Sequence, residues 1–173
     1  IGKQGHVAYP KLALNPIDGI LKICNELKLP LDKGSKAFQP SNLVITSIDV
    51  GNNITNLIPN KGSIKFNVRF NDNFDSTSLI NLLHNRIKKT DENYRLEVSV
   101  SGESFFNFSE KITQAIVNSI QKITKLTPEL STTGGTSDAR FISKLCPVIE
   151  FGLIGKTMHQ LNEKKEIKDI KNL

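Results

Sequence analysis

The chain has 173 residues, of which 38% are hydrophobic and 23% charged, and its formal net charge is +6. These values allow a packed core and exclude wholesale disorder, and no apolar run approaches the roughly 18 residues of a membrane helix. The positive charge is compatible with an anionic small substrate, whereas scattered lysines, 2 tyrosines and no tryptophan disfavour nucleic-acid binding.

The first helix is predicted to begin at Asn15-Pro16, with Asn as the N-cap and Pro at the first helical position. Leu29-Pro30 is predicted to end it. One helical face carries the apolar side chains of Ile17, Ile20, Leu21, Cys24 and Leu27. After a loop over residues 31–41, the β-branched residues of the segment from Leu43 to Val50 predict a strand.

Residues 64–70 predict a half-buried strand, because apolar side chains alternate there with Lys65, Asn67 and Arg69. Asp75 is expected to cap a second helix. Alternation of Leu96, Val98 and Val100 predicts a last strand. If residues 2–10 supply the first strand, residues 1–104 form a β-α-β-β-α-β domain. This is a ferredoxin-like arrangement, in which two helices cover one face of a four-stranded antiparallel sheet.

Residues 105–173 have α/β character. Ser109 is the expected N-cap of a long amphipathic helix, and a short helix is expected around residues 141–145. The apolar segment from Pro147 to Phe151 predicts a strand, and a final helix is expected after residue 166. A continuous apolar strand requires neighbours on both sides. The segment contains too few strands for a sheet of its own, so we interpret it as part of a larger α/β domain.

The two cysteines, Cys24 and Cys146, are far apart and form no C-x-x-C pair, which favours a reduced, cytoplasmic setting. Of the three histidines, His84 is expected to be a solvated residue of the second helix. His6 and His159 lie in glycine-bearing loops and are either surface residues or functional ones.

His159 follows the apolar segment and precedes Asn162 and Glu163. A neutral imidazole is a common zinc ligand with a second nitrogen that needs an orienting partner. Zinc requires three or four ligands, however, and the spacing of residues indicates no further cluster. Both interpretations of His159 therefore stay open.

Three polar features have two interpretations each. The turn STTGGTSDAR (131–140) either offers backbone N–H groups to an anion or is a turn capped by Ser137 or Asp138. Arg69 is either a bidentate carboxylate clamp or an ordinary exposed arginine. Asn56 either contacts a ligand or serves only its turn.

Five segments occur together in an order and spacing that resemble the succinyl-diaminopimelate desuccinylase family. They are GKQGHVAYPKLALNPI (2–17), GNNITNLIPNKGSIKFNVRF (51–70), VSGESFF (100–106), STTGGTSDARFI (131–142) and MHQLNE (158–163). The family comprises dinuclear zinc amidohydrolases of the aminoacylase and carboxypeptidase superfamily. GHVAYP and TGGTSDARF favour it over acetylornithine deacetylase and the glutamate-releasing carboxypeptidases.

The resemblance implies a catalytic α/β domain interrupted by a ferredoxin-like lid that also forms a homodimer. Residues 1–104 would be the lid, and residues 105–173 the C-terminal part of the catalytic domain. The implied reaction is hydrolysis of N-succinyl-L,L-2,6-diaminopimelate to succinate and L,L-diaminopimelate, a step towards lysine and peptidoglycan. In the family, two zinc ions, or one zinc with one cobalt, activate a bridging water, and a glutamate is the general base.

The resemblance also implies roles for individual residues. His6 would donate to the oxyanion in the active site of the other subunit. His159 would be a ligand of one metal ion. The residues expected to contact substrate are Tyr9, Asn56, Arg69, Ser101, Gly135 and Thr136.

The sequence departs from the family pattern, and its expected final helix is also shorter than the family's. The family's N-terminal His-x-Asp motif, bridging Asp, two further acidic ligands and general-base Glu have no counterpart in these 173 residues. We therefore expect a fragment that has no hydrolase activity alone and binds zinc weakly. The alternatives are a non-catalytic dimerisation module or a related zinc deacylase such as acetylornithine deacetylase.

Overall fold

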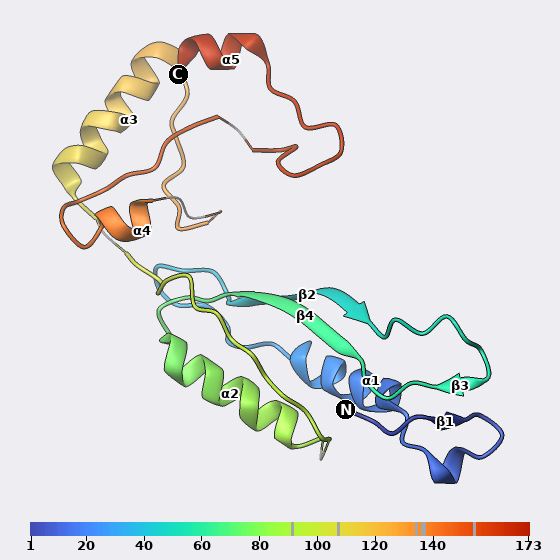
Figure 1. Cartoon of the computed structure of the whole chain (residues 1–173). Coiled ribbons are helices and arrows are strands. Elements are labelled where there is room, and N and C mark those ends of the chain that lie inside the picture. Colours follow the sequence, from blue (N-terminus) through green and yellow to red (C-terminus); the bar gives the residue numbers. More distant parts are fainter. Residues whose placement is uncertain (91, 107, 134, 136–137, 154) are drawn as a thin grey trace. The chain divides into compact units, whose positions relative to one another are not determined.

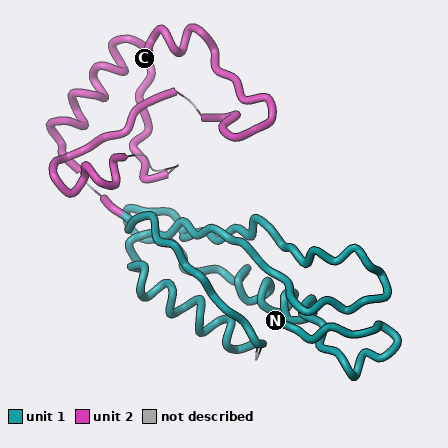
Figure 2. Tube along the Cα trace, viewed as in Figure 1, with its two compact units in different colours: residues 1–104 teal, residues 105–173 magenta. Residues whose placement is uncertain are grey.

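The chain forms two compact units in the computed structural model, which describes residues 1–90, 92–106, 108–133, 135, 138–153 and 155–173. Unit 1 comprises Ile1–Ser104 and unit 2 comprises Phe105–Leu173 (Figure 2). No helix within these described ranges is long and apolar enough to cross a membrane.

Unit 1 mixes helices and strands (Figure 1). Its elements in chain order are β1 (Gly5–His6), a 3-10 turn η1 (Pro10–Leu12), α1 (Pro16–Leu27), β2 (Asn42–Asp49), β3 (Leu57–Ile58), β4 (Ser63–Arg69) and α2 (Ser76–Lys88).

Both predicted helix starts in unit 1 are confirmed. The Asn15 side chain accepts a hydrogen bond from the backbone N–H of Ile17, and Pro16 is the first residue of α1. The Asp75 carboxylate accepts from the backbone N–H of Ser78, whose hydroxyl bonds back to the Asp75 backbone. This reciprocal capping box satisfies donors that the first turn of α2 would otherwise leave unpaired.

The alternating pattern of residues 64–70 also predicts the observed burial. β4 pairs antiparallel with β2, and an irregularity in register lies between Ile45 and Ser47. Ile64, Phe66 and Val68 are half-buried, and the polar residues between them are exposed. The period of two has therefore placed one face of β4 on the core and the other in solvent.

The core of unit 1 lies between its two helices and one face of the β2–β4 sheet, and both helices lie on that face (Figure 1). Its buried centre comprises Leu27, Leu79, Leu83 and Ile87. Half-buried side chains packed against this centre include Leu43, Phe66, Val68, Tyr94 and Leu96. Burying one such side chain contributes about 1.5–3 kcal/mol. The predicted α+β class is confirmed.

The sheet itself differs from the prediction of four strands. Among the described residues there are two two-stranded sheets, β1–β3 and β2–β4. Residues 92–104 carry no strand, although Tyr94 and Leu96 pack on the core and Val98 and Val100 are exposed. Alternation predicts which side chains are buried, but not whether the backbone finds a hydrogen-bonded partner.

Unit 2 contains α3 (Glu110–Thr124), α4 (Ala139–Ile142) and α5 (Ile167–Asn172). The long amphipathic helix is confirmed, and Ser109 occupies the N-cap position without a side-chain cap bond. The predicted strand from Pro147 to Phe151 is not formed. A strand requires a partner for its N–H and C=O groups, and the described part of unit 2 contains no other strand.

Candidate functional site

Residues 5–12 and 56–58 form a short arm of unit 1, which brings His6 and Asn56 together. β1 pairs antiparallel with β3, so that His6 lies opposite Leu57. The backbone N–H of Val7 donates to the carbonyl oxygen of Asn56 at 3.2 Å. Two motifs that are fifty residues apart in sequence are therefore neighbours through backbone pairing.

The imidazole of His6 is held by its own turn. Its Nδ1 accepts a hydrogen bond from the backbone N–H of Ala8 at 3.1 Å. A neutral imidazole with an accepting Nδ1 carries its proton on Nε2, which is then a donor. Because His6 is exposed, this Nε2–H can donate to a group from outside the arm. When the ring is neutral, the turn therefore leaves Nε2 as the hydrogen-bond donor of His6.

Tyr9 lies beside His6. Its backbone N–H donates to the His6 carbonyl oxygen at 2.9 Å, which closes the turn. The two rings are 6.0 Å apart between centroids and tilted by 55°. Of the predicted site residues, the arm therefore brings together the catalytic candidate His6 and the substrate-contact candidates Tyr9 and Asn56.

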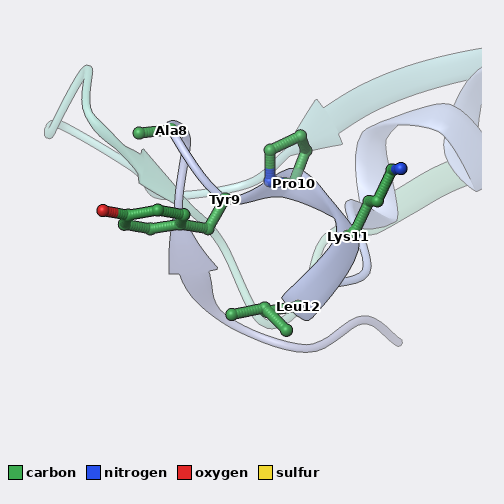
Figure 3. A pocket seen from close by; sticks show the side chains of 5 residues that line it. All are labelled: Ala8, Tyr9, Pro10, Lys11 and Leu12. Atoms are coloured by element: carbon green, nitrogen blue, oxygen red, sulfur yellow. The ribbon is translucent and has the colours of Figure 1, made fainter.

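The residues that come shortly after His6 in the chain line a surface hollow of about 290 Å³ (Figure 3). It is lined by Ala8, Tyr9, Pro10, Lys11 and Leu12. Tyr9 is 64% exposed and Leu12 69% exposed, so the hollow is open to solvent and does not enclose a ligand on its own. Any ligand bound there would need a second surface to cover it.

Arg69 is the last residue of β4 and lies at the C-terminal end of this strand. It lies opposite Asn42 of β2 and is exposed. Within the described ranges no acidic side chain forms an ion pair with Arg69. Its guanidinium can therefore bind a carboxylate from outside the unit. Among the described residues, the strand pairing that includes Arg69 joins β4 to β2 and not to β1 or β3.

Ser101 is exposed in the extended stretch of residues 92–104. Two residues later, the Glu103 carboxylate accepts from the backbone N–H of Ser76 at 2.9 Å. This bond adds a second carboxylate to the first turn of α2, where the helix dipole favours negative charge. The end of unit 1 is thereby attached to α2.

His159 lies in a turn of unit 2 with φ +60°, a backbone conformation that is uncommon for residues other than glycine. Its backbone N–H donates to the Glu163 carboxylate at 3.2 Å, and its side chain is exposed. Gly135 is also exposed, whereas Thr136 lies outside the described residues.

A metal site is not assembled by the part of the chain that the structure describes. No group of three His, Cys, Asp or Glu side chains there lies close enough to hold a metal ion. His159 alone does not meet the three or four ligands that zinc needs. The described donor set therefore does not fit a zinc site.

Sequence reasoning missed two anchoring carboxylates. Asp32 accepts hydrogen bonds from Ser41 and Asn71, and Glu103 accepts from Ser76. The only local signal for Asp32 is its position two residues before a glycine, which is typical of a side chain that closes a turn. Glu103 had no local signal, because its partner lies 27 residues earlier.

Residues 1–95 match the family model described as peptidase dimerisation domain. Two relatives with the name succinyl-diaminopimelate desuccinylase are similar in sequence to this chain along almost all of its length. The one from Pelagibacter ubique (strain HTCC1062) is 50% identical over 178 residues, and the alignment spans 100% of this chain and 46% of the relative. The one from Rhizorhabdus wittichii is 49% identical, with 98% and 45% covered. The chain thus spans about half the length of these curated relatives.

A solved structure shares the fold. Aminopeptidase PepT from Bacillus cereus ATCC 10987 superposes with a TM-score of 0.61 at 21% identity, over 83% of this chain and 38% of that one. At this identity the likeness concerns the fold alone. The family model covers more than half of the 173 residues. This chain therefore belongs to the peptidase dimerisation domain family.

Proposed function

We propose that this chain is part of a succinyl-diaminopimelate desuccinylase. In this proposal residues 1–104 are the lid, which forms a homodimer, and residues 105–173 belong to the catalytic domain. The protein containing them hydrolyses the amide bond of N-succinyl-L,L-2,6-diaminopimelate to succinate and L,L-diaminopimelate in the cytoplasm. The 46–50% identity to desuccinylases along the whole chain supports this reaction over others of the superfamily.

The observation that carries the proposal is the hydrogen bond from the Ala8 backbone N–H to His6 Nδ1. Attack on an amide carbonyl produces an oxyanion, and a donor placed beforehand lowers the barrier to forming it. His6 offers Nε2–H from an exposed turn that already holds its ring through Nδ1. We assign it the role of oxyanion donor to the active site of the second subunit.

The other assignments follow the exposed polar groups. Arg69 binds a carboxylate of the substrate, because its guanidinium is exposed and makes no ion pair among the described residues. The remaining proposed substrate contacts are Tyr9, Asn56, Ser101, Gly135 and Thr136. His159 would supply one ligand to zinc, or to cobalt in its place. We expect weak zinc binding by this chain alone, since its described residues form no group of three or more potential ligands.

A chimera tests this function. The chain replaces the matching segment of the Pelagibacter ubique desuccinylase, and hydrolysis of succinylated and acetylated substrates is measured. We expect desuccinylation, and a fall in kcat of about 10²–10³-fold for His6→Ala. His84→Ala is the matched control, because His84 is exposed on α2 and its ring bonds Tyr94.

Three results would contradict the proposal. They are an inactive chimera that still forms dimers, a His6→Ala chimera with full activity, and a preference for the acetylated substrate. The last would favour a deacylase such as acetylornithine deacetylase. Desuccinylation by the 173-residue chain alone would contradict the expectation that it is inactive without further segments.

A second candidate is a non-catalytic dimerisation module, which the family match over residues 1–95 favours. Sedimentation equilibrium of the purified chain distinguishes monomer from dimer. A dimer is expected from both candidates. A monomer at high concentration would count against the lid assignment and against the module alike.

A further inference from the structure

The loop between α1 and β2 is organised around the carboxylate of Asp32. This carboxylate accepts hydrogen bonds from the backbone N–H groups of Gly34 and Ser41, the latter at 3.1 Å. It also accepts from the side-chain amide of Asn71 at 2.8 Å. One side chain thus closes the loop and attaches it to the segment that follows β4.

Asn71 is the most firmly buried polar residue of this network, at 2% exposure. Its side-chain amide also donates to the Gln39 carbonyl oxygen at 3.0 Å, and its backbone N–H donates to the Ser41 hydroxyl at 3.0 Å. A buried amide that loses such a partner is destabilising, because its desolvation is no longer compensated. Asp32 and Ser41 therefore both supply partners that the buried Asn71 needs.

This network begins where the β2–β4 ladder stops. Asn42 and Arg69 form the last pair of the ladder. Ser41 directly precedes Asn42, and Asn71 lies two residues beyond Arg69. The ends of a two-stranded ladder open readily, because nothing pairs beyond them. Here the Ser41–Asn71 bond continues the connection between the two strands past the final pair.

The hydrogen bonds of this network stabilise the ionised form of the Asp32 carboxylate. Burial alone would raise the pKa of Asp32, but the hydrogen bonds from Ser41, Gly34 and Asn71 outweigh it and hold that pKa below its ordinary value. Asp32 is therefore ionised at neutral pH. It forms no ion pair with Arg69 among the described residues, so the exposed guanidinium of Arg69, two residues before Asn71 in the chain, can pair with an external anion.

We infer that Asp32, Ser41 and Asn71 form a frame that positions Arg69 for a substrate carboxylate. Asp32 is then a positioning residue, which acts on the substrate through Arg69. The inference rests on the proposed role of Arg69 as the carboxylate clamp. It explains how the end of β4 that carries Arg69 is held in place although the sheet has only two strands.

The test compares Asp32→Asn with Asp72→Asn in the whole 173-residue chain. Both substitutions remove one negative charge, and Asp72 is the exposed neighbour of Asn71. Amide hydrogen exchange is followed by NMR. We expect exchange at the Asn71 amide to rise about 10-fold or more in Asp32→Asn, with little change in α2 and little change anywhere in Asp72→Asn. Ser41→Ala removes the hydroxyl that accepts from the Asn71 backbone N–H and also hydrogen-bonds Asp32, and it serves if Asp32→Asn does not fold.

Succinate is the probe for positioning. Titration is read at the Arg69 side-chain Nε–H signal, and Arg69→Ala identifies that signal. We expect Asp32→Asn and Ser41→Ala to weaken succinate binding severalfold, and Asp72→Asn to leave it unchanged. Equal succinate binding in the unsubstituted chain, Asp32→Asn, Ser41→Ala and Asp72→Asn would overturn the positioning while leaving the role of Arg69 intact. No response of Arg69 in the unsubstituted chain would overturn the clamp and the positioning together.

Discussion

The guanidinium of Arg86 on α2 donates a hydrogen bond to the carbonyl oxygen of Leu29, 2.6 Å away and just beyond the end of α1. A second bond from the same group reaches the carbonyl of Pro30 at 2.7 Å. The planar fork of arginine allows both bonds at once, which a lysine ammonium does not match in geometry. The two helices are thus joined by a polar clamp in addition to their apolar contact.

Arg86→Ala is therefore expected to lower the free energy of unfolding by about 1–2 kcal/mol, since two charge-assisted bonds at a partly exposed site are lost. Arg86→Lys should recover part of this. Arg95→Ala is the control, because Arg95 pairs with Glu97 in full solvent and is expected to contribute little. Urea unfolding followed by circular dichroism measures all three. Equal losses of unfolding free energy in Arg86→Ala and Arg95→Ala would show that the Arg86 bonds to Leu29 and Pro30 do not stabilise the fold.

Two leucines of α1 allow a matched test of the core. Leu27 is 1% exposed, and Leu21 is 56% exposed on the same helix. Leu27→Ala should destabilise the chain by about 2–5 kcal/mol, because it leaves a cavity among Leu79, Leu83 and Ile87. Leu21→Ala should cost well under half as much. Urea midpoints compare the two, and similar midpoints would mean that this cluster is not the core.

The cap of α2 should make stability depend on acid pH. The backbone N–H of Ser78, followed by its hydroxyl, lowers the pKa of Asp75 below its ordinary value. A lowered pKa means that the ionised carboxylate stabilises the fold. Its contribution is complete above the ordinary pKa and is lost as pH falls through the folded value.

Asp75→Asn isolates this contribution, because asparagine is an equally good N-cap but does not titrate in this range. We expect the Tm of the variant to lie below that of the unsubstituted chain at pH 7, where the carboxylate also interacts with the helix dipole, and the gap to narrow as the pH is lowered through the acid range. Thermal melts at a series of pH values give the comparison. A Tm difference independent of pH would disprove the assignment.

The two thiols should react at different rates. Cys24 is buried in α1, and burial raises the pKa of its thiol, with Lys28 opposing the shift weakly. Cys146 is exposed. Since the thiolate is the reactive form, iodoacetamide should label Cys146 first and Cys24 only after urea is added. Mass spectrometry of the intact chain and of Cys146→Ser reads the result. Rapid labelling of Cys146→Ser in native buffer would mean that α1 opens readily.

Local signals in the sequence predicted the helix starts well. Asn15-Pro16 and Asp75 each satisfy backbone donors within three residues, so their effect does not depend on the rest of the chain. The alternation of residues 64–70 likewise determines which side chains of β4 face the core. These predictions hold because a helix cap and a strand face are decided within one turn or a few residues.

Strand partners could not be predicted in the same way. Leu96 packs on the core as its pattern indicates, yet the stretch around it joins no ladder, and the segment from Pro147 to Phe151 also remains outside any strand. Pairing requires a second segment in register, and that segment is distant in sequence. The pattern of one segment does not identify the segment with which it pairs.

The sequence by itself determined the family resemblance, the helix caps, the buried face of β4 and the identities of the candidate site residues. Only the tertiary structure decided that Asn56 lies beside the turn of His6, and that Asp32 and Asn71 connect the strands at Arg69. The physical reason is range. Caps and periodic faces arise from neighbours along the chain, whereas hydrogen bonds such as that between Asp32 and Asn71 join residues 39 positions apart.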